Sequence, residues 1–147
     1  MTKLLLLSAL VLSATALAGD SKVAPETHVL PPDLKWAQPF GPQGPSFAFV
    51  EGKYGDKHPA SFFAKLSAGG DSGWHFHNEA YNAVVISGQF TEQQQGDKAE
   101  TVLPAGSYLT QPGKIVHRNG CLKGADCIVF VHFDKGADST PVKDKGQ

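Results

Sequence analysis

Two histidines separated by one residue, His75 and His77, are the clearest chemically capable pair in the sequence. In a β-strand, side chains at positions i and i+2 point to the same face, with Cα atoms about 6.5 Å apart. Two imidazoles at that spacing can bind one ion, because metal–nitrogen bonds are about 2.0–2.1 Å long. The alternative is a pair of polar strand positions facing solvent. The pair alone therefore indicates a metal site only weakly.

Further residues at defined spacings surround the pair and extend downstream. In order they are Gly69, His75, His77, Tyr81 and Gly88, then Gly106, Pro112, Gly113 and His117. This pattern resembles the two motifs of the cupin superfamily, and the resemblance covers about residues 47–133. Three positions depart from it. Tyr81 replaces the glutamate of the first motif, Gly106 falls one place early, and Cys121 stands where the second motif has asparagine.

The cupin resemblance implies an all-β fold, a double-stranded β-helix with a metal at the mouth of the barrel. It assigns His75, His77 and His117 as the ligands, since these occupy the histidine positions of the motifs. Three histidines suit one divalent transition metal, and neutral imidazoles do not distinguish Fe, Mn, Ni, Cu and Zn. Three protein ligands leave positions open for water or substrate, as catalytic metals require. A metal-free pocket is the alternative.

Tyr81 and Glu79 are the candidate catalytic residues beside these histidines. A phenol with a pKa near 10 is a poor ligand at neutral pH but can donate a hydrogen bond to a substrate oxygen. Tyr81 would otherwise be a buried aromatic that fills the barrel. Glu79 could serve as a ligand or general base, or be a solvated residue in the connection between two strands.

A site of three histidines resembles that of cupins such as the acetylacetone-cleaving dioxygenase type. The resemblance implies a mononuclear metal dioxygenase acting on a small diketone, phenol or enol. A protein that binds a metal or small ligand without turnover is the main alternative, because a fold does not determine function. A metal-dependent isomerase or a sugar-modifying cupin is a third interpretation.

Short apolar runs separated by Gly, Pro and Asp predict the elements that position these residues, and no run has a helical period. The expected strands are Phe47–Glu51, Ser61–Ser67, Trp74–His77, Tyr81–Thr91, Glu100–Leu103, Ser107–Gln111, Ile115–Arg118 and Cys127–Phe133. A Pro-rich extended arm is expected at residues 19–45, a barrel at 46–134 and a flexible tail at 135–147. Leu30, Leu34, Trp36 and Phe40 are the expected anchors of the arm. Since extended arms often pair with a sheet edge, the arm also suggests a homodimer.

The remaining histidines and the aromatic residues have less specific roles. We expect His28 and His58 at the surface, and His132 in the core or at the rim of the barrel. The expected core aromatics, some of which could instead line an apolar substrate pocket, are Trp74, Phe62, Phe63, Phe90, Tyr108 and Phe130.

The first 18 residues predict a cleaved signal peptide: Lys3, an apolar run, and Ala16-Leu17-Ala18 as the cleavage pattern. Without Lys3 the formal charge is 12 − 14 = −2, which argues against a nucleic-acid partner. No membrane span is expected after cleavage, so we expect a periplasmic or secreted protein. In such an oxidising compartment Cys121 and Cys127 are expected to form a disulfide, with two free thiols as the alternative.

Overall fold

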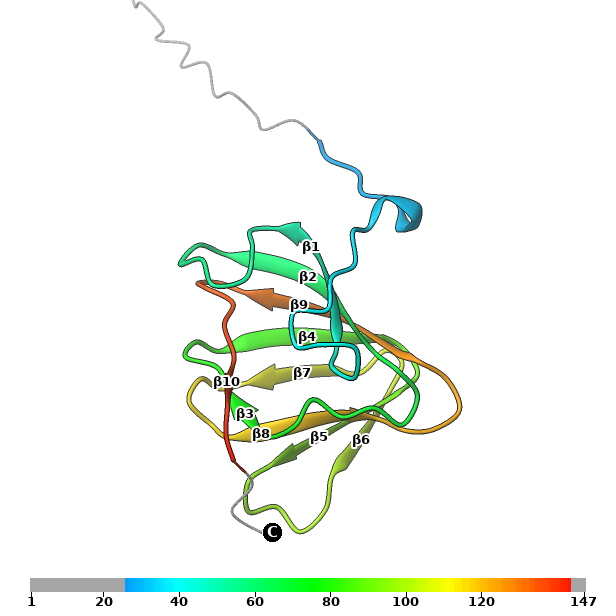
Figure 1. The fold of residues 1–147 in the computed structure, drawn as a ribbon, viewed down its shortest axis with the longest axis vertical. Coiled ribbons are helices and arrows are strands. Elements are labelled where there is room, and N and C mark those ends of the chain that lie inside the picture. The colour runs from blue at the N-terminus through cyan, green and yellow to red at the C-terminus, as the bar shows by residue number, and fades with distance from the viewer. Residues whose placement is uncertain (1–25, 144–147) are drawn as a thin grey trace, which may run out of the picture.

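The computed structural model describes residues 26–143, which form two antiparallel five-stranded β-sheets packed against each other (Figure 1). In chain order the elements are η1 (Pro31–Asp33), β1 (Ser46–Glu51), β2 (Ala60–Leu66), β3 (His75–Phe76), β4 (Tyr81–Ser87), β5 (Gln89–Gln94), β6 (Thr101–Pro104), β7 (Tyr108–Gln111), β8 (His117–Cys121), β9 (Cys127–Phe133) and β10 (Thr140–Pro141). The strand orders are β1-β2-β9-β4-β7 in the first sheet and β10-β3-β8-β5-β6 in the second. This architecture confirms the expected all-β, double-stranded β-helix.

The core lies between the two sheets, and strand alternation determines which residues enter it. Along β9 the residues alternate between buried and half-buried, from Cys127 to Phe133. Tyr81, Ala83 and Val85 of β4 are buried in the same way. Because successive side chains of a strand point to opposite faces, each strand gives one apolar face to the core.

The run Tyr81–Thr91, expected as one strand, is two strands in different sheets. Gly88 separates them with a φ of +81°, a conformation that favours glycine. A Cβ at this position would lie 2.7 Å from Sγ of Cys127 and 2.8 Å from the carbonyl oxygen of Asp126. The expectation of one strand was therefore wrong, because an apolar run does not show where the chain turns a corner.

Cys121 and Cys127 are joined as a disulfide, as expected, with their Cα atoms 5.7 Å apart. Cys121 ends β8 in the second sheet and Cys127 begins β9 in the first. The bond therefore links the two sheets at one end of the barrel.

Several expected core aromatics lie elsewhere. Phe62 and Phe90 are buried, but Tyr108 is 63% exposed. Phe63 and Phe130 pack against each other with ring centroids 5.3 Å apart, and both are only partly buried. Since even-numbered residues of β9 alternate with the buried ones, Phe130 faces away from the core.

The described part of the arm, residues 26–45, touches the barrel through few contacts. Ala37 forms an isolated bridge with Phe47 at the edge of β1. Phe40 packs edge-to-face on Phe47 with ring centroids 6.0 Å apart, and the amine of Lys65 lies 5.1 Å from the centre of the Trp36 ring. Leu30 is 60% exposed, so it is no anchor.

Residues 134–143, which we call the strap, cross the ends of strands from both sheets (red in Figure 1). The strap contains β10, which pairs with β3, and the amide of Val142 donates to the carbonyl of Trp74 (2.8 Å). The carbonyl of Ala137 accepts from the amide of Gly55 (2.8 Å). Within the expected flexible tail, hydrogen bonds to the barrel therefore continue as far as Val142.

The signal peptide predicted at residues 1–18 lies outside the described residues. Among residues 26–143, no helix has the length and apolarity needed to cross a membrane.

Candidate metal centre

The three histidines of the predicted site come together at the end of the barrel crossed by the strap. His75 in β3 is directly opposite His117 in β8, and His77 follows β3 by one residue. One nitrogen of each ring lies within 4.8 Å of the other two. His117 is fully buried, His75 is 7% exposed, and His77 is partly buried. The pairing of β3 with β8 therefore brings the histidines of both sequence motifs together.

Each imidazole is oriented by a backbone carbonyl. The Nδ1–H groups of His75 and His117 donate to the carbonyls of Gly73 (2.8 Å) and Ile115 (2.9 Å), and Nδ1–H of His77 donates to the carbonyl of Asp138. Since a carbonyl only accepts, Nδ1 carries the proton and Nε2 keeps its lone pair. Metal-binding histidines characteristically have such a partner on the second nitrogen.

Burial keeps these rings neutral. Burial is the largest cause that brings the pKa of His77 and of His117 to about 4; the backbone hydrogen bonds oppose this change and the neighbouring histidines add to it. Burial also lowers the pKa of His75. Nε2 of His117 is buried and has no hydrogen-bond partner in residues 26–143. Three neutral rings, one with an orphaned buried nitrogen, fit a bound transition metal.

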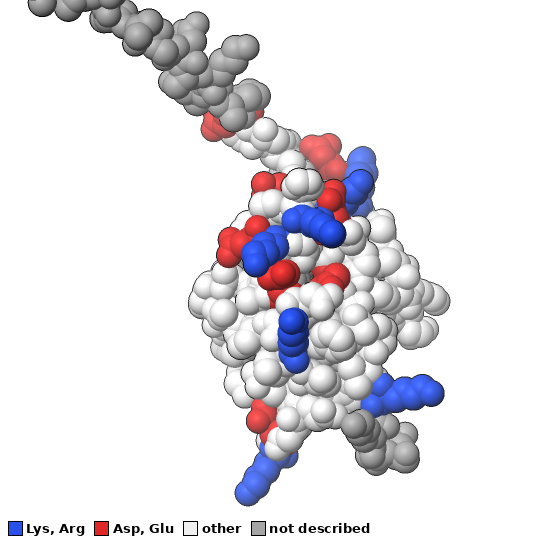
Figure 2. Space-filling model, turned by 90° about the vertical axis from the view of Figure 1, so that its left-hand side faces the viewer, with Lys and Arg blue, Asp and Glu red and all other residues white. Residues whose placement is uncertain are grey.

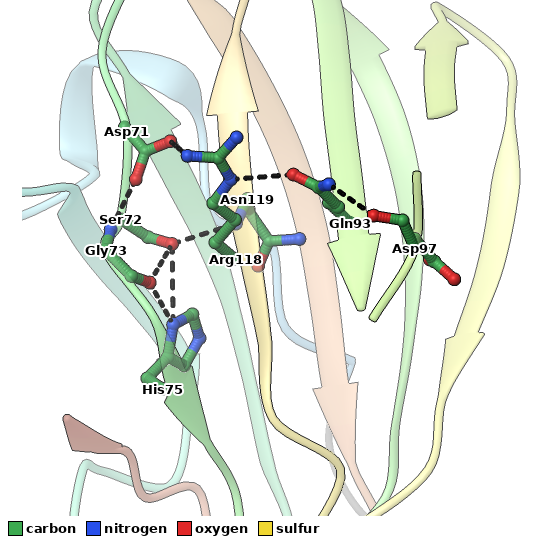
Figure 3. Close-up of polar contacts among 8 residues, drawn as sticks. All are labelled: Asp71, Ser72, Gly73, His75, Gln93, Asp97, Arg118 and Asn119. Atoms are coloured by element: carbon green, nitrogen blue, oxygen red, sulfur yellow. Dashed lines mark hydrogen bonds and ion pairs between the residues drawn. The ribbon is translucent and has the colours of Figure 1, made fainter. Parts of the chain in front are cut away.

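A polar network behind His75 fixes the turn that leads into β3 (Figure 3). The amide of Gly73 donates to the Asp71 carboxylate (2.6 Å), and Nη1 of Arg118 lies 3.9 Å from the same carboxylate. Nε of Arg118 also donates to Gln93 (3.0 Å). The Arg118 side chain therefore connects this turn to β8 and β5.

The strap fixes His77 in a similar way. Asp138 accepts from His77 through its carbonyl and from the backbone amide (3.0 Å) and side-chain amide of Asn78 through its carboxylate. The orientation of His77, a candidate metal ligand, thus depends on a segment far along the chain. Charged side chains also gather on the upper half of this end of the molecule (Figure 2).

Tyr81 lies beside the histidines, with its ring centroid 5.1 Å from that of His77 and 6.2 Å from that of His117. It is 6% exposed, and burial raises the pKa of the phenol well above its usual value. The charge of Glu92 acts in the same direction, while the neighbouring side chain of Asn119 opposes it. The phenol of Tyr81 is therefore buried and neutral beside the histidines.

Glu79 does not join this group. One of its carboxylate oxygens lies 3.3 Å from the amine of Lys135, and the residue lines a separate polar cleft with Asp56 and Lys57. The structure thus offers no geometry that supports Glu79 as a ligand or base. Glu79 therefore does not substitute for the glutamate that the motif has at the position of Tyr81, because the connection turns Glu79 toward the strap.

An apolar cavity of about 190 Å³ opens beside the histidines. Its wall includes Phe47, Phe49, Phe62, Phe90, Val129 and Val131. His75, His77, Tyr81, Asn119 and Ser72 form its polar side, and the strap contributes Ala137 to Ser139 and Pro141. No Lys or Arg of residues 26–143 lines it.

Sequence reasoning missed Asn119, Glu92 and Asp138. Asn119 and Glu92 are paired across β8 and β5 and share the inward face of His117. Oε1 of Glu92 and Nδ2 of Asn119 are buried without partners in the described chain, and burial raises the pKa of Glu92. The i+2 spacing from His117 to Asn119 was the signal that could have identified Asn119.

The other histidines lie outside this site. The side chains of His28 and His58 are 73% and 82% exposed, as expected for surface residues. His132 belongs to neither the core nor the cavity: its Nδ1 is 2.8 Å from Oγ of Ser61, and its Nε2 is 3.2 Å from Asp134.

The comparisons with solved structures support the fold at low sequence identity. The polyketide cyclase RemF from Streptomyces resistomycificus aligns with a TM-score of 0.67 and 15% identity, over 83% of this chain and 89% of that one. KdgF from Halomonas sp. aligns at 0.59 and 14%, over 75% and 94%. An RmlC-like cupin from Shewanella frigidimarina NCIMB 400 aligns at 0.59 and 16%, over 75% and 92%.

No curated protein matches the sequence. A family described as a domain of unknown function, DUF4437, matches residues 31–138, which include the barrel, all three histidines and part of the strap. The chain therefore belongs to the DUF4437 family, and its fold is that of a cupin.

Proposed function

We propose that this protein binds one divalent transition metal through Nε2 of His75, His77 and His117. The observation that carries the proposal is the orientation of the rings. All three Nδ1 atoms are occupied by backbone carbonyls, while a nitrogen from each ring lies within 4.8 Å of the others. Neutral imidazoles in this arrangement fit Fe, Mn, Ni, Cu or Zn.

A metal held by three protein ligands supplies a Lewis acid with open positions next to the cavity. The residues around it prepare the site for a small, apolar ligand with oxygen atoms. Tyr81 offers a neutral O–H donor, and the aromatic wall excludes water. We further propose that the protein is a dioxygenase that uses O2 to oxidise a small diketone, phenol or enol, with Tyr81 rather than Glu79 orienting the substrate oxygen.

A non-catalytic binding protein is the second candidate, and one observation favours it. Among residues 26–143 the only carboxylate in the cavity wall belongs to Asp138, which is already bonded to Asn78. Glu79, a candidate ligand or base, is paired with Lys135. A cavity wall without a free carboxylate suits storage or transport of a metal or ligand as well as it suits turnover.

We also propose that the protein is exported. The pattern at residues 1–18 and the Cys121–Cys127 disulfide both favour an oxidising compartment, either periplasmic or secreted.

Metal content is the first test. His77→Ala should abolish stoichiometric metal, measured by elemental analysis, because it removes one of three ligands. His58→Ala is the matched control, since the His58 side chain is 82% exposed and belongs to neither the histidine cluster nor the cavity wall. Full metal content in a folded His77→Ala protein would refute the assignment.

Oxygen uptake then separates the two functions. Protein loaded with Fe(II) should consume O2 in the presence of acetylacetone or a flavonol. Binding of metal without uptake for any metal or substrate of this panel would leave the binding protein as the function.

A further inference from the structure

We propose that the N-terminal arm is part of the ligand site: Phe40 covers the outer end of the cavity and contacts an aromatic ring of the bound molecule. The ligand class is then a small molecule with oxygen atoms at one end, which face the histidines, and one aryl ring at the other end. The inference rests on the proposed function, because it takes the ligand to bind in the same cavity. It does not depend on whether the ligand is oxidised.

Phe40 belongs to a loop of the arm that is closed at the edge of β1 (cyan in Figure 1). Ala37 and Phe47 exchange two backbone hydrogen bonds, of 2.9 and 2.8 Å, which join the ends of the loop. Inside it the amide of Gly44 donates to the carbonyl of Gly41 (3.1 Å). A Cβ at Gly44 would lie 3.0 Å from Cβ of Phe40, so a glycine there lets the loop fold back closely against Phe40. The loop therefore holds Phe40 at a fixed place on the barrel.

The ring of Phe40 lies at the opening of the cavity. Phe40 lines the cavity and is also 42% exposed, and the same holds for Tyr54 at 40%. The two rings meet edge-to-face, with centroids 5.8 Å apart. The hydroxyl of Tyr54 donates to the carbonyl of Ser139 in the strap (3.2 Å). Since a residue that lines a cavity and also faces solvent belongs to its rim, the arm, Tyr54 and the strap form one continuous part of this rim.

A continuous line of rings connects Phe40 to the histidines. The ring centroid of Phe47 lies 6.0 Å from that of Phe40 and 5.3 Å from that of Phe62. The centroid of Phe133 lies 6.2 Å from that of Phe62 and 5.4 Å from that of His77. All five residues line the cavity. One wall is therefore aromatic over its whole length, and aromatic pairs are more stable than their buried area alone would give.

The size and charge of the cavity limit what this wall can bind. A dry cavity of about 150 Å³ holds benzene, so 190 Å³ accommodates one ring with a small substituent. No Lys or Arg of residues 26–143 lines the cavity, so a carboxylate or phosphate on the ring is disfavoured. Small diketones that carry one aryl group combine the two ends that the cavity requires.

Two diketones that differ in one substituent test the contact with Phe40. Benzoylacetone has a phenyl group where acetylacetone has a methyl group. We would measure both dissociation constants by calorimetric titration of Zn-loaded protein, since Zn²⁺ has no redox chemistry and turnover is avoided. Phe40→Ala and Phe40→Leu remove the ring. Trp36→Ala is the matched control, because Trp36 is another partly exposed arm aromatic (37%) that contacts Lys65 and does not line the cavity.

Wild type should bind benzoylacetone more tightly than acetylacetone, because the phenyl group buries more apolar area. Phe40→Ala should reduce this preference by about twofold to tenfold, as expected for the loss of one aromatic contact. Phe40→Leu should act in the same direction, and Trp36→Ala should leave the preference unchanged. Acetylacetone reports on the site itself, since a variant with a disturbed fold would bind both diketones more weakly. If Phe40→Ala no longer binds acetylacetone, Phe40→Leu decides.

Equal binding of the two diketones to wild type would overturn the proposal. An unchanged preference in a Phe40 variant that still binds acetylacetone would do the same, as would an equal loss of preference in Trp36→Ala.

Toluene separates this inference from the proposed function, because it contains a ring and needs no metal. Its dissociation constant is measured in metal-free protein by NMR titration of the methyl resonances. Weaker toluene binding to Phe40→Ala, in a protein that binds no metal, would refute only the proposed function. Metal binding together with a preference that Phe40 does not affect would refute only the role of Phe40. Wild type that binds neither toluene nor benzoylacetone would overturn the inference.

Discussion

The low pKa of His117 makes the stability of the metal-free protein depend on pH. Its folded pKa is about 4, whereas the unperturbed value is 6.5. The unfolded chain therefore binds more protons than the folded one between these values, and stability must fall as pH falls. Above about pH 6.5 the ring is mostly neutral in both the folded and the unfolded state, so little stability is lost there. For two pKa values 6.5 and about 4, the loss between pH 8 and pH 4.5 is about 2 to 3 kcal/mol from this residue.

His117→Gln removes the titrating group while keeping a polar side chain of similar length. We expect it to reduce the change in the free energy of unfolding between pH 8 and pH 4.5 by about 2 to 3 kcal/mol. Urea denaturation of EDTA-treated protein measures this change, and His58→Gln is the control at an exposed histidine.

An equal pH dependence in wild type and His117→Gln would refute the reasoning, because His117 would then not be a neutral buried ring. Saturating Zn²⁺ should raise wild-type stability most at neutral pH and less at pH 4.5, since the metal and protons compete for the same nitrogens.

Three further predictions concern the surroundings of the site. Tyr81→Phe should leave metal stoichiometry unchanged by elemental analysis, because the phenol is a neutral donor; loss of the metal would make Tyr81 a ligand. Cys121→Ser should lower the free energy of unfolding by about 2 kcal/mol, the chain-entropy value for so short a loop, in urea denaturation, and wild type under reducing conditions should match it. Gly136→Ala would place a Cβ 2.1 Å from the carbonyl oxygen of Asp56, so it should displace the strap, weaken metal affinity in a competition titration and lower Tm. Lys135→Ala, at an exposed position, should do none of these.

The strands could be predicted because their apolar residues recur with a period of two. The corner at Gly88 could not be located in the same way, since residues on both sides of it are apolar or β-branched. A glycine inside a strand pattern is a recognised sign of a bend. The close approach of Gly88 to Cys127 shows why only glycine fits there.

The strap was beyond prediction for a different reason. Its sequence is polar and contains Gly and Pro, so local propensity favours a loop. Its order comes from partners far along the chain, such as Asn78 and Trp74. Hydrogen bonds of this kind leave no periodic signal in the sequence.

The resemblance to the cupin motifs was enough to bring the three histidines together, but the direction of Glu79 could not be predicted. Parity along a strand predicts which face a residue takes only while the strand continues, and β3 ends at Phe76. The i+2 spacing from His117 places Asn119 on the same strand face, but an amide at such a position does not by itself indicate a functional residue, so Asn119 was missed.

The Cys121–Cys127 bond and the strap lie at opposite ends of the barrel, and this asymmetry predicts where the proposed ligand would enter or leave. One end is closed covalently across the two sheets, and the other is closed only by backbone and side-chain hydrogen bonds. Motions that separate the sheets must therefore be largest at the strap. Ligand exchange should follow the rate at which the strap opens, and residues such as Gly136 and Asp138 would govern residence time without contributing to the chemistry.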